Sequence, residues 1–367
     1  MNTLPLRLSI VVPTLNESSN VRELLARLGA VLGPTGWEVI FVDDDSPDGT
    51  ADVVREIAQG DPRVRCLQRV GRRGLSSACI EGMLAASSPA IAVMDADLQH
   101  DETILPAMLA EIEHGEADLV VATRYAPGGT TGEWSPGRRG MSRLATAASR
   151  LVAKHTVSDP MSGFFMLQRT VLRSTVHGLS GVGFKILLDI LATAKSPLRI
   201  AEVPYRFRPR FAGESKLDEA AVWGYGMLLA DKTVGRFVPV QLAAFSLIGG
   251  LGILVHMATL ILFLKGFGVG FITAQTAGIA VAMIFNYTVN NLLTYRDRRL
   301  RGWAWLKGLA SFMIACSVGA LANVGIAAYL FAGRTQWIVA ALAGVLVGAV
   351  WNYAITQVYT WGQRSSS

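Results

Sequence analysis

Two acidic clusters in the first third of the chain combine residue types that bind cations and phosphates. The clearer one is Asp95-Ala96-Asp97-Leu98-Gln99, which directly follows the apolar run at 90–94. Its two carboxylates and its amide supply hard oxygen ligands of the kind Mg²⁺ prefers, and such ions usually complete their shell with substrate phosphates and water. An isolated Asp-x-Asp pair often lies in a surface loop, but the preceding strand pattern favours a site. The cluster therefore predicts a Mg²⁺ or Mn²⁺ ion that faces a phosphate leaving group.

The second cluster is the run Asp43–Thr50, with the sequence Asp-Asp-Asp-Ser-Pro-Asp-Gly-Thr. Three adjacent carboxylates repel one another unless a cation or several hydrogen-bond donors lie close. Part of the run is turn chemistry, because Pro-Asp-Gly favours a turn and Asp48 or Thr50 can cap the helix that follows. We assign Asp44 to a nucleotide, and Asp45 and Asp48 to the turn.

Continuous apolar runs, typical of strands buried on both faces, position these clusters. The alternation of such runs with helical patterns predicts an α/β layered fold with a mostly parallel sheet. Ligands of such sheets bind beyond the carboxyl ends of the strands, where both clusters and the segment Pro13–Glu17 fall. Taken alone, that segment could equally be a strand-to-helix loop with an Asn cap. The expected strands are 8–12, 38–42, 90–94 and 118–122, and the expected helices are 20–32, 50–59, 76–86 and 104–114.

The last third of the chain has a different composition. Only two of the 28 acidic residues, Asp231 and Asp297, follow residue 229, and the mean hydropathy of +0.37 is high for a soluble enzyme. Four charge-free stretches each exceed the roughly 20 apolar residues that cross a bilayer, so four transmembrane helices are predicted. The stretches are Val240–Leu264, Val269–Tyr295, Gly308–Gly333 and Thr335–Gly362.

Basic residues predict the orientation of these helices. The connection between the second and third stretches carries Arg296, Arg298, Arg299 and Arg301, whereas the other two turns carry one cation each. Lys and Arg concentrate in cytoplasmic loops, so this loop and both termini are expected on the cytoplasmic side. Lys232, Arg236 and Arg364 agree, and the amino terminus shows no signal-peptide pattern.

The same composition excludes some classes of function. The net charge of +6 comes from the apolar part and does not indicate a nucleic-acid surface, which would combine clustered cations with exposed aromatic residues. The three cysteines have neither the number nor the spacing of a disulfide framework or a zinc site.

A weak internal repeat links the two halves of the apolar region. Phe285-Asn286-Tyr287 and Trp351-Asn352-Tyr353 lie 66 residues apart, as do Thr294-Tyr295 and Thr360-Trp361. This spacing predicts two related helical hairpins. Their polar residues could bond between helices or line a path for a lipid or sugar. These residues are Asn286, Asn290, Asn291, Asn323, Asn352 and Gln357.

Together the motifs resemble the dolichol-phosphate (polyprenol-phosphate) mannosyltransferase family of inverting glycosyltransferases, over roughly residues 7–220. The apolar tail is similar to the GtrA-like membrane module. The resemblance implies a Rossmann-like nucleotide-diphospho-sugar transferase (GT-A type) domain at 1–220, an interface helix at 221–238 and a four-helix transmembrane domain at 239–363. The matching elements are Pro13–Glu17, Val42–Thr50, Gly74–Gly82, Asp95–His100, Thr123–Tyr125, Asp159, Ser162–Phe164 and Gly213–Leu217.

The resemblance also implies an activity and a role for each matched residue. The activity is transfer of mannose from GDP-mannose to a polyprenyl phosphate, with Mg²⁺ or Mn²⁺. The metal would bind Asp97 and Gln99. The nucleoside would contact Pro13, Leu15, Glu17, Val42 and Asp44, although the family more often has Tyr at position 15. The nucleotide-sugar would also contact Asp95, Ala96, Asp97 and Arg124, with Arg210 and Lys216 on its diphosphate, and the lipid phosphate would contact Arg124, Arg138 and Ser142.

The chemistry of the acceptor agrees with this set of residues. A phosphate monoester carries about −1.5 to −2 charges at pH 7, so it is already a nucleophile, and His100, His177 and Asp189 are not required as strong bases. Arginine forks suit the task of holding two anions in line. The Gly-rich stretch Pro127–Gly132 could form a mobile acceptor loop. The amphipathic segments 142–155 and 221–237 could lie at a membrane interface or be core helices.

Four other functions share some of these sequence features. Transfer of glucose from UDP-glucose to undecaprenyl phosphate is poorly separated by sequence, and only Ser46–Thr50 and Gly213–Leu217 favour GDP-mannose. A nucleotidylyltransferase should have a Gly-rich basic loop after the first strand. A processive synthase should have further acidic and aromatic motifs after residue 160. A lipid-linked sugar transporter is disfavoured by the intact Asp95, Asp97 and Gln99, although transport could be a second activity of the tail.

Overall fold

The computed structural model describes residues 5–34, 36–127, 129–130, 149, 155, 157–181, 183–208, 226–229, 231–232, 240–295, 298–333 and 337–361. The chain divides into two compact units, Met1–Thr233 and Val234–Ser367. This division falls inside the expected interface helix at 221–238, most of which lies outside the described residues.

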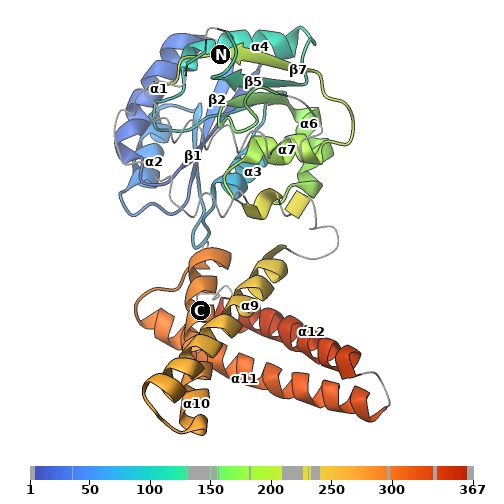
Figure 1. Ribbon diagram of the computed structural model, residues 1–367. Helices are drawn as coiled ribbons and strands as arrows, with labels where there is room; N and C mark the ends of the chain where they lie inside the picture. The colour runs from blue at the N-terminus through green and yellow to red at the C-terminus, as the bar shows by residue number, and fades with distance from the viewer. Residues whose placement is uncertain are drawn as a thin grey trace. The chain divides into compact units, whose positions relative to one another are not determined.

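The first unit is built on a seven-stranded sheet with the order β3-β2-β1-β4-β6-β5-β7 (Figure 1). Among the described strands, β6 alone runs antiparallel to its neighbours, β4 and β5, and the other pairs are parallel. The expected α/β class is confirmed, and the sheet is mixed. The strands are β1 Leu8–Thr14, β2 Trp37–Asp43, β3 Val64–Gln68, β4 Ala90–Val93, β5 Leu119–Thr123, β6 Phe165–Gln168 and β7 Ile200–Pro204.

Helices cover both faces of this sheet, because its central strands alternate their apolar side chains between two cores. In β1, Ile10 and Val12 face one core and Val11 faces the other, and all are fully buried. Helices α1, α2 and α4 pack on the first core, and α3, α6 and α7 on the second. The helices are α1 Ser18–Leu32, α2 Thr50–Gly60, α3 Leu75–Ala85, α4 Leu105–Glu113, α6 Arg169–Thr175 and α7 Ile186–Thr193.

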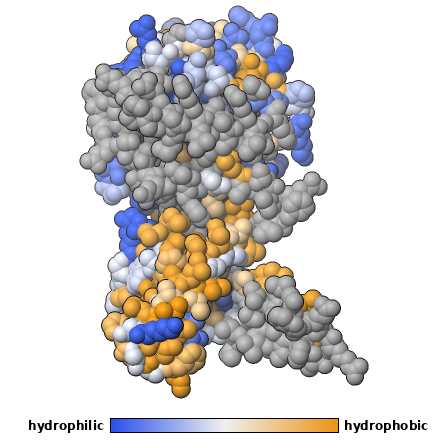
Figure 2. Space-filling model, in the orientation of Figure 1, coloured by the Kyte–Doolittle hydropathy of each residue, from blue (hydrophilic) through white to orange (hydrophobic). Residues whose placement is uncertain are grey.

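The second unit is helical, and each of the four predicted apolar stretches contains a helix. Among the residues that the structure describes, two segments are long and apolar enough to cross a membrane: Val240–Gly266 and Phe271–Thr294. Figure 2 shows apolar side chains gathered on the surface of this unit, as expected for a lipid-facing region. The helices are α9 Val240–Ile261, α10 Phe271–Val289, α11 Trp303–Ala332 and α12 Trp337–Ile355, with π-helical turns at Leu262–Gly266, Asn290–Thr294 and Thr356–Thr360.

The internal repeat appears in this unit as related contacts. The π-helical turns after α10 and α12 begin 66 residues apart, and the equivalent rings of Tyr295 and Trp361 stack with centroids 4.0 Å apart and an angle of 11°. The Asn286 amide packs against Gly252 of α9, and the Asn352 amide packs against Gly319 of α11. These two asparagines therefore lie between helices, but their Oδ1 atoms make no hydrogen bond with other described residues, so the predicted bonds between helices are not seen for these atoms.

Candidate active site

The carboxyl ends of β1, β2, β3, β4 and β5 share one edge of the sheet. Strands β1 to β4 are parallel, and β5 has the same direction because β6 is antiparallel to both β4 and β5. Each of β1, β2 and β4 is followed by one non-glycine residue with a left-handed backbone. These residues are Asn16 with φ 57°, Asp45 with φ 58° and Leu98 with φ 61°. Such conformations are uncommon outside glycine and gather at functional sites. The strain at this edge agrees with the position predicted for the site.

The turn after β2 is organised by two of its acidic residues. Asp43 accepts hydrogen bonds from the Thr14 hydroxyl at 3.0 Å and from the Ser46 N–H at 2.9 Å. Asp48 accepts from the Thr50 N–H and the Ser18 N–H, both at 3.1 Å. Burial would raise the pKa of Asp48, but the hydrogen bonds from Thr50 and Ser18 lower it below its usual value. The assignment of Asp48 to the turn is confirmed by these contacts.

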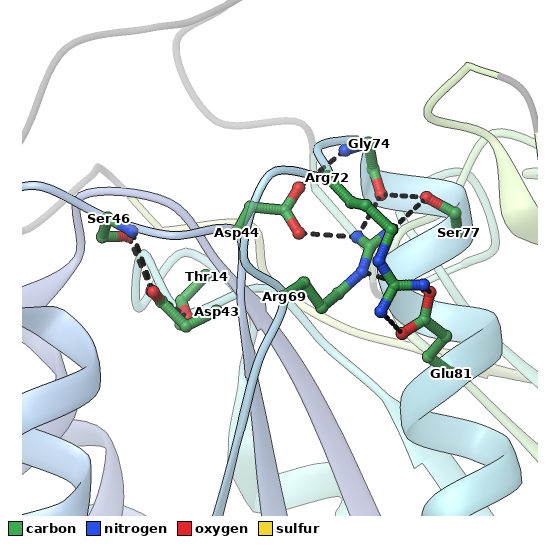
Figure 3. A network of polar contacts seen from close by, with 9 residues as sticks. All are labelled: Thr14, Asp43, Asp44, Ser46, Arg69, Arg72, Gly74, Ser77 and Glu81. Atoms are coloured by element: carbon green, nitrogen blue, oxygen red, sulfur yellow. Dashed lines mark hydrogen bonds and ion pairs between the residues drawn. The ribbon is translucent and has the colours of Figure 1, made fainter. Parts of the chain in front are cut away.

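Asp44 forms a buried network with a residue that sequence analysis did not select (Figure 3). Its Oδ1 lies 2.6 Å from Nη1 of Arg69, and its Oδ2 accepts the Gly74 N–H at 2.6 Å. The Arg69 side chain is only 2% exposed and also donates to the Ser77 hydroxyl at 2.6 Å. The repulsion among the three adjacent aspartates was the one available signal for a nearby cation, and Arg69 is that cation.

The network affects both the pKa of Asp44 and the capacity of its carboxylate to accept further hydrogen bonds. Burial raises the pKa of this carboxyl, while the Gly74 N–H and the Arg69 charge oppose the rise. A carboxylate offers about four acceptor sites, so contact with a nucleoside would have to share the oxygens that Arg69 and Gly74 already use. The network also fixes residues 69–74, which connect β3 to the start of α3.

The second acidic cluster stands at the end of β4. The Asp95 side chain is 40% exposed, whereas Asp97 is 7% exposed and accepts the Gln99 N–H at 3.2 Å. The Gln99 amide nitrogen donates to the Arg208 carbonyl at 3.1 Å, so its amide oxygen keeps its acceptor capacity. Two carboxylates and an amide oxygen form a donor set that fits a hard divalent cation.

No group of three His, Cys, Asp or Glu residues suited to a metal occurs among the described residues. A cation held by two carboxylates and an amide would need other ligands to complete its shell. Mg²⁺ commonly takes these from substrate phosphates and water, which agrees with a site that is completed by a nucleotide.

His100 contacts the Asp95 carboxylate and holds it in place. Its Nε2 lies 3.1 Å from Oδ2 of Asp95, and its Nδ1 lies 3.0 Å from the Tyr205 hydroxyl. Both ring nitrogens are therefore engaged, and the ring is 3% exposed. Gly163 also adjoins Asp95, because a Cβ added at this glycine would lie 3.0 Å from Oδ2. The Ser-Gly-Phe motif thus leaves room for the Asp95 carboxylate.

Arg124 follows β5 and is held by a buried carboxylate. Its Nε and Nη2 donate to the two oxygens of Asp159 at 2.7 and 2.9 Å, and Asp159 is fully buried. Burial opposes the charge of Arg124, but its bonds to Asp159 raise the pKa, so the guanidinium stays cationic. The pair fixes the plane of this fork at the same edge of the sheet as Asp95.

The remaining predicted residues divide into two groups. Pro13 and Val42 are partners in the β1–β2 register and are buried, while Leu15 and Glu17 are partly exposed beyond β1. Ala96 is buried between the two aspartates. The other predicted residues, Arg138, Ser142, Arg210 and Lys216, lie outside the described residues.

Comparison with known proteins identifies the family. A model described as glycosyl transferase family 2 matches residues 9–175, and one described as GtrA/DPMS, transmembrane domain, matches residues 244–361. The dolichol-phosphate mannosyltransferase of Pyrococcus furiosus is 32% identical over 363 residues, covering 97% of this chain and 99% of that relative. The chain belongs to the dolichol-phosphate mannosyltransferase family.

Two further dolichol-phosphate mannosyltransferases match part of this chain. Those of Saccharomyces cerevisiae and Mycosarcoma maydis are 37% and 34% identical over 238 residues. Each match covers 62% of this chain, with 88% and 80% of the respective relative. This family member is therefore a glycosyltransferase with a transmembrane domain attached.

Proposed function

We propose that this enzyme transfers mannose from GDP-mannose to the phosphate of a dolichol-type polyprenol, with inversion at the sugar. The observation that carries the proposal is that an acidic cluster and a buried arginine lie at the same edge of the sheet. Asp95 and Asp97 stand at the end of β4, and Arg124 is fixed by Asp159 at the end of β5. Oxygen ligands for a cation that would face the donor diphosphate thus share an edge with an arginine whose positive charge suits an acceptor phosphate.

The metal assignment rests on the donor set described above. Asp97 and Gln99 would hold Mg²⁺ or Mn²⁺, which would supply neutralising charge for the departing diphosphate. Asp95 would orient the sugar-nucleotide, because His100 and Gly163 leave its carboxylate one defined position. The remaining nucleoside contacts are proposed for Pro13, Leu15, Glu17, Val42 and Asp44, with Arg210 and Lys216 on the diphosphate.

The acceptor needs orientation more than activation. A phosphate monoester is already anionic at neutral pH, and His100 is an unsuitable base because Asp95 and Tyr205 engage both of its nitrogens. We assign Arg124, Arg138 and Ser142 to the acceptor phosphate. The ion pair with Asp159 would keep the fork of Arg124 aligned, which is the entropy-saving role that positioning groups have in catalysis.

The membrane arrangement completes the proposal. We propose four transmembrane helices, with the catalytic unit and both termini on the cytoplasmic side. The proposed domains are the transferase domain at 1–220, the interface helix at 221–238 and the transmembrane domain at 239–363. The basic connection between α10 and α11 supports this orientation. Lys232 supports it less than its sequence position implies, because its ammonium pairs with buried Asp189 at 2.5 Å.

The test is transfer of radiolabelled mannose from GDP-mannose to a polyprenyl phosphate by the full-length protein in detergent. Metal-dependent formation of a mannosyl lipid that a chelator stops is the expected result. Transfer from UDP-glucose alone would move the enzyme to the glucosyl reaction, and transfer from neither donor would refute the lipid acceptor.

Asp97→Asn should abolish the metal-dependent transfer. Asp52→Asn is a matched control, because the Asp52 side chain is 83% exposed on α2 and should leave the rate unchanged. Wild-type turnover in the Asp97 variant would refute the metal assignment.

A further inference from the structure

A polar pocket lies in the second unit, between the end of α10 and the start of α11. Its volume is about 310 Å³, and its lining includes Thr288, Asn291, Arg299, Arg301 and Trp305. None of these residues belongs to the proposed catalytic machinery. The pocket therefore needs an explanation of its own.

The backbone of the pocket is held by one buried side chain. Asn291 is 2% exposed, and its Oδ1 accepts the Leu300 N–H at 2.9 Å while its Nδ2 donates to the Leu300 carbonyl at 3.0 Å. The same Oδ1 accepts the indole N–H of Trp361 at 3.1 Å. Leu300 packs with the aromatic cluster that contains Tyr287 and Phe312. Because Leu300 is fixed on both its polar and apolar sides, its two neighbours along the chain have a defined spacing.

Those neighbours are Arg299 and Arg301, and both line the pocket. Both are exposed, and neither makes a hydrogen bond or ion pair with another described residue. The one acidic residue of this unit, Asp297, lies outside the described residues. Two guanidinium forks that face one pocket favour an anion with several oxygens, above all a phosphate.

The position of the pocket indicates which phosphate. Thr288 and Asn291 belong to the segment Phe271–Thr294, which is apolar enough to cross a membrane, and they lie at its end. Trp305 lines the pocket, and Trp303 beside it is 70% exposed. Tryptophan gathers at the level of lipid headgroups, and basic pockets between membrane helices bind anionic headgroups.

We propose that Arg299 and Arg301 bind the headgroup phosphate of an anionic membrane phospholipid. The Arg-Leu-Arg sequence supplies the geometry, since the middle residue is anchored and the outer two line the pocket. The site is separate from the residues proposed for mannosyl transfer, so loss of lipid binding should leave transfer in detergent intact.

The test is titration of the full-length protein in neutral detergent with short-chain phosphatidylglycerol, with bound lipid counted by native mass spectrometry. Arg299→Ala combined with Arg301→Ala should weaken binding roughly 30-fold, since each cation near an anionic headgroup contributes about 1 kcal/mol. Arg299→Lys combined with Arg301→Lys keeps the charge and should weaken binding less. This second variant decides the matter if the alanine variant does not fold.

Lys265→Ala is the control for general charge, because Lys265 is an exposed cation in the other described turn of this unit. It should leave the affinity unchanged. Unaltered binding in the double alanine variant, or an equal loss with Lys265→Ala and with Arg299→Ala alone, would overturn the site. Displacement of the phospholipid by inorganic phosphate or by polyprenyl phosphate would overturn its assignment to a phospholipid.

Discussion

Arg69→Gln tests whether the Asp44–Arg69 pair holds the nucleotide edge of the sheet together. Both side chains are nearly inaccessible, at 8% for Asp44 and 2% for Arg69. Removing one partner of a buried pair costs about 3–5 kcal/mol, and the lower value is expected because the Gly74 N–H still bonds Asp44. For a domain of this size, about 3 kcal/mol lowers the melting temperature by roughly 6–12 °C.

The assay is thermal unfolding of the full-length protein in detergent, with Arg72→Gln as the matched control. Arg72 lies in the same segment and pairs with Glu81, but its side chain is 49% exposed, so its loss should cost only about 0–1 kcal/mol. Equal melting temperatures for the two variants would refute the structural weight given to Arg69. A partial recovery on adding Asp44→Asn would show that the stranded carboxylate causes the loss.

The pH dependence of Arg69→Gln gives a second test. Without Arg69, the already raised pKa of Asp44 should rise further, because burial remains and the neighbouring positive charge is gone. The native state then binds this proton more tightly than the unfolded chain, whose carboxyl has a pKa of about 3.9. Stability of the variant should therefore fall as pH rises from about 4 through the native pKa. A difference from wild type that shrinks toward neutral pH would contradict this.

Three further substitutions test other contacts. Gly163→Ala places a methyl group 3.0 Å from Oδ2 of Asp95, so turnover should fall roughly 10- to 100-fold with little change in melting temperature; wild-type turnover would contradict the role of Gly163. Asp189→Asn removes the charge partner of Lys232, whose ammonium keeps its hydrogen bonds to the Gly178 carbonyl and the Thr193 hydroxyl. The loss should therefore be near the lower end of about 3–5 kcal/mol, and thermal unfolding should show recovery when Lys232→Met is added. Arg138→Ala should raise KM for the lipid acceptor far more than for the donor, and equal rises would exclude the assigned role.

The sequence was most informative where one element carries its own signal. Strands β1, β2, β4 and β5 are continuous apolar runs, and each was expected within two residues of its observed limits at either end. The edge strands β3 and β7 are partly exposed and contain polar residues, so they lack the pattern of a strand buried on both faces. Strand β6 has only four residues, and its antiparallel direction depends on the long connection after β5.

The same distinction applies to the candidate site. Asp95, Asp97 and Gln99 were found because they are close in sequence and follow a strand. The partners that hold the site are far apart in sequence: Arg69 lies 25 residues from Asp44, and Asp159 lies 35 residues from Arg124. No local pattern reports such pairs, because only the sheet order brings them together. Lys232 shows the converse, since it resembled a solvated topology signal and is paired with a buried acid.

The stack of Tyr295 on Trp361 has a consequence for the order of assembly. Trp361 is 1% exposed and contacts Tyr287, Tyr295 and Phe312, all of which precede it in the chain. During synthesis it emerges after the four helices that the structure describes in this unit. The hairpin of α9 and α10 is therefore synthesised while the aromatic cluster is incomplete. Its final packing forms only after α12 and Trp361 have been synthesised. Quality control that acts during this interval would act on the first hairpin rather than on the completed enzyme.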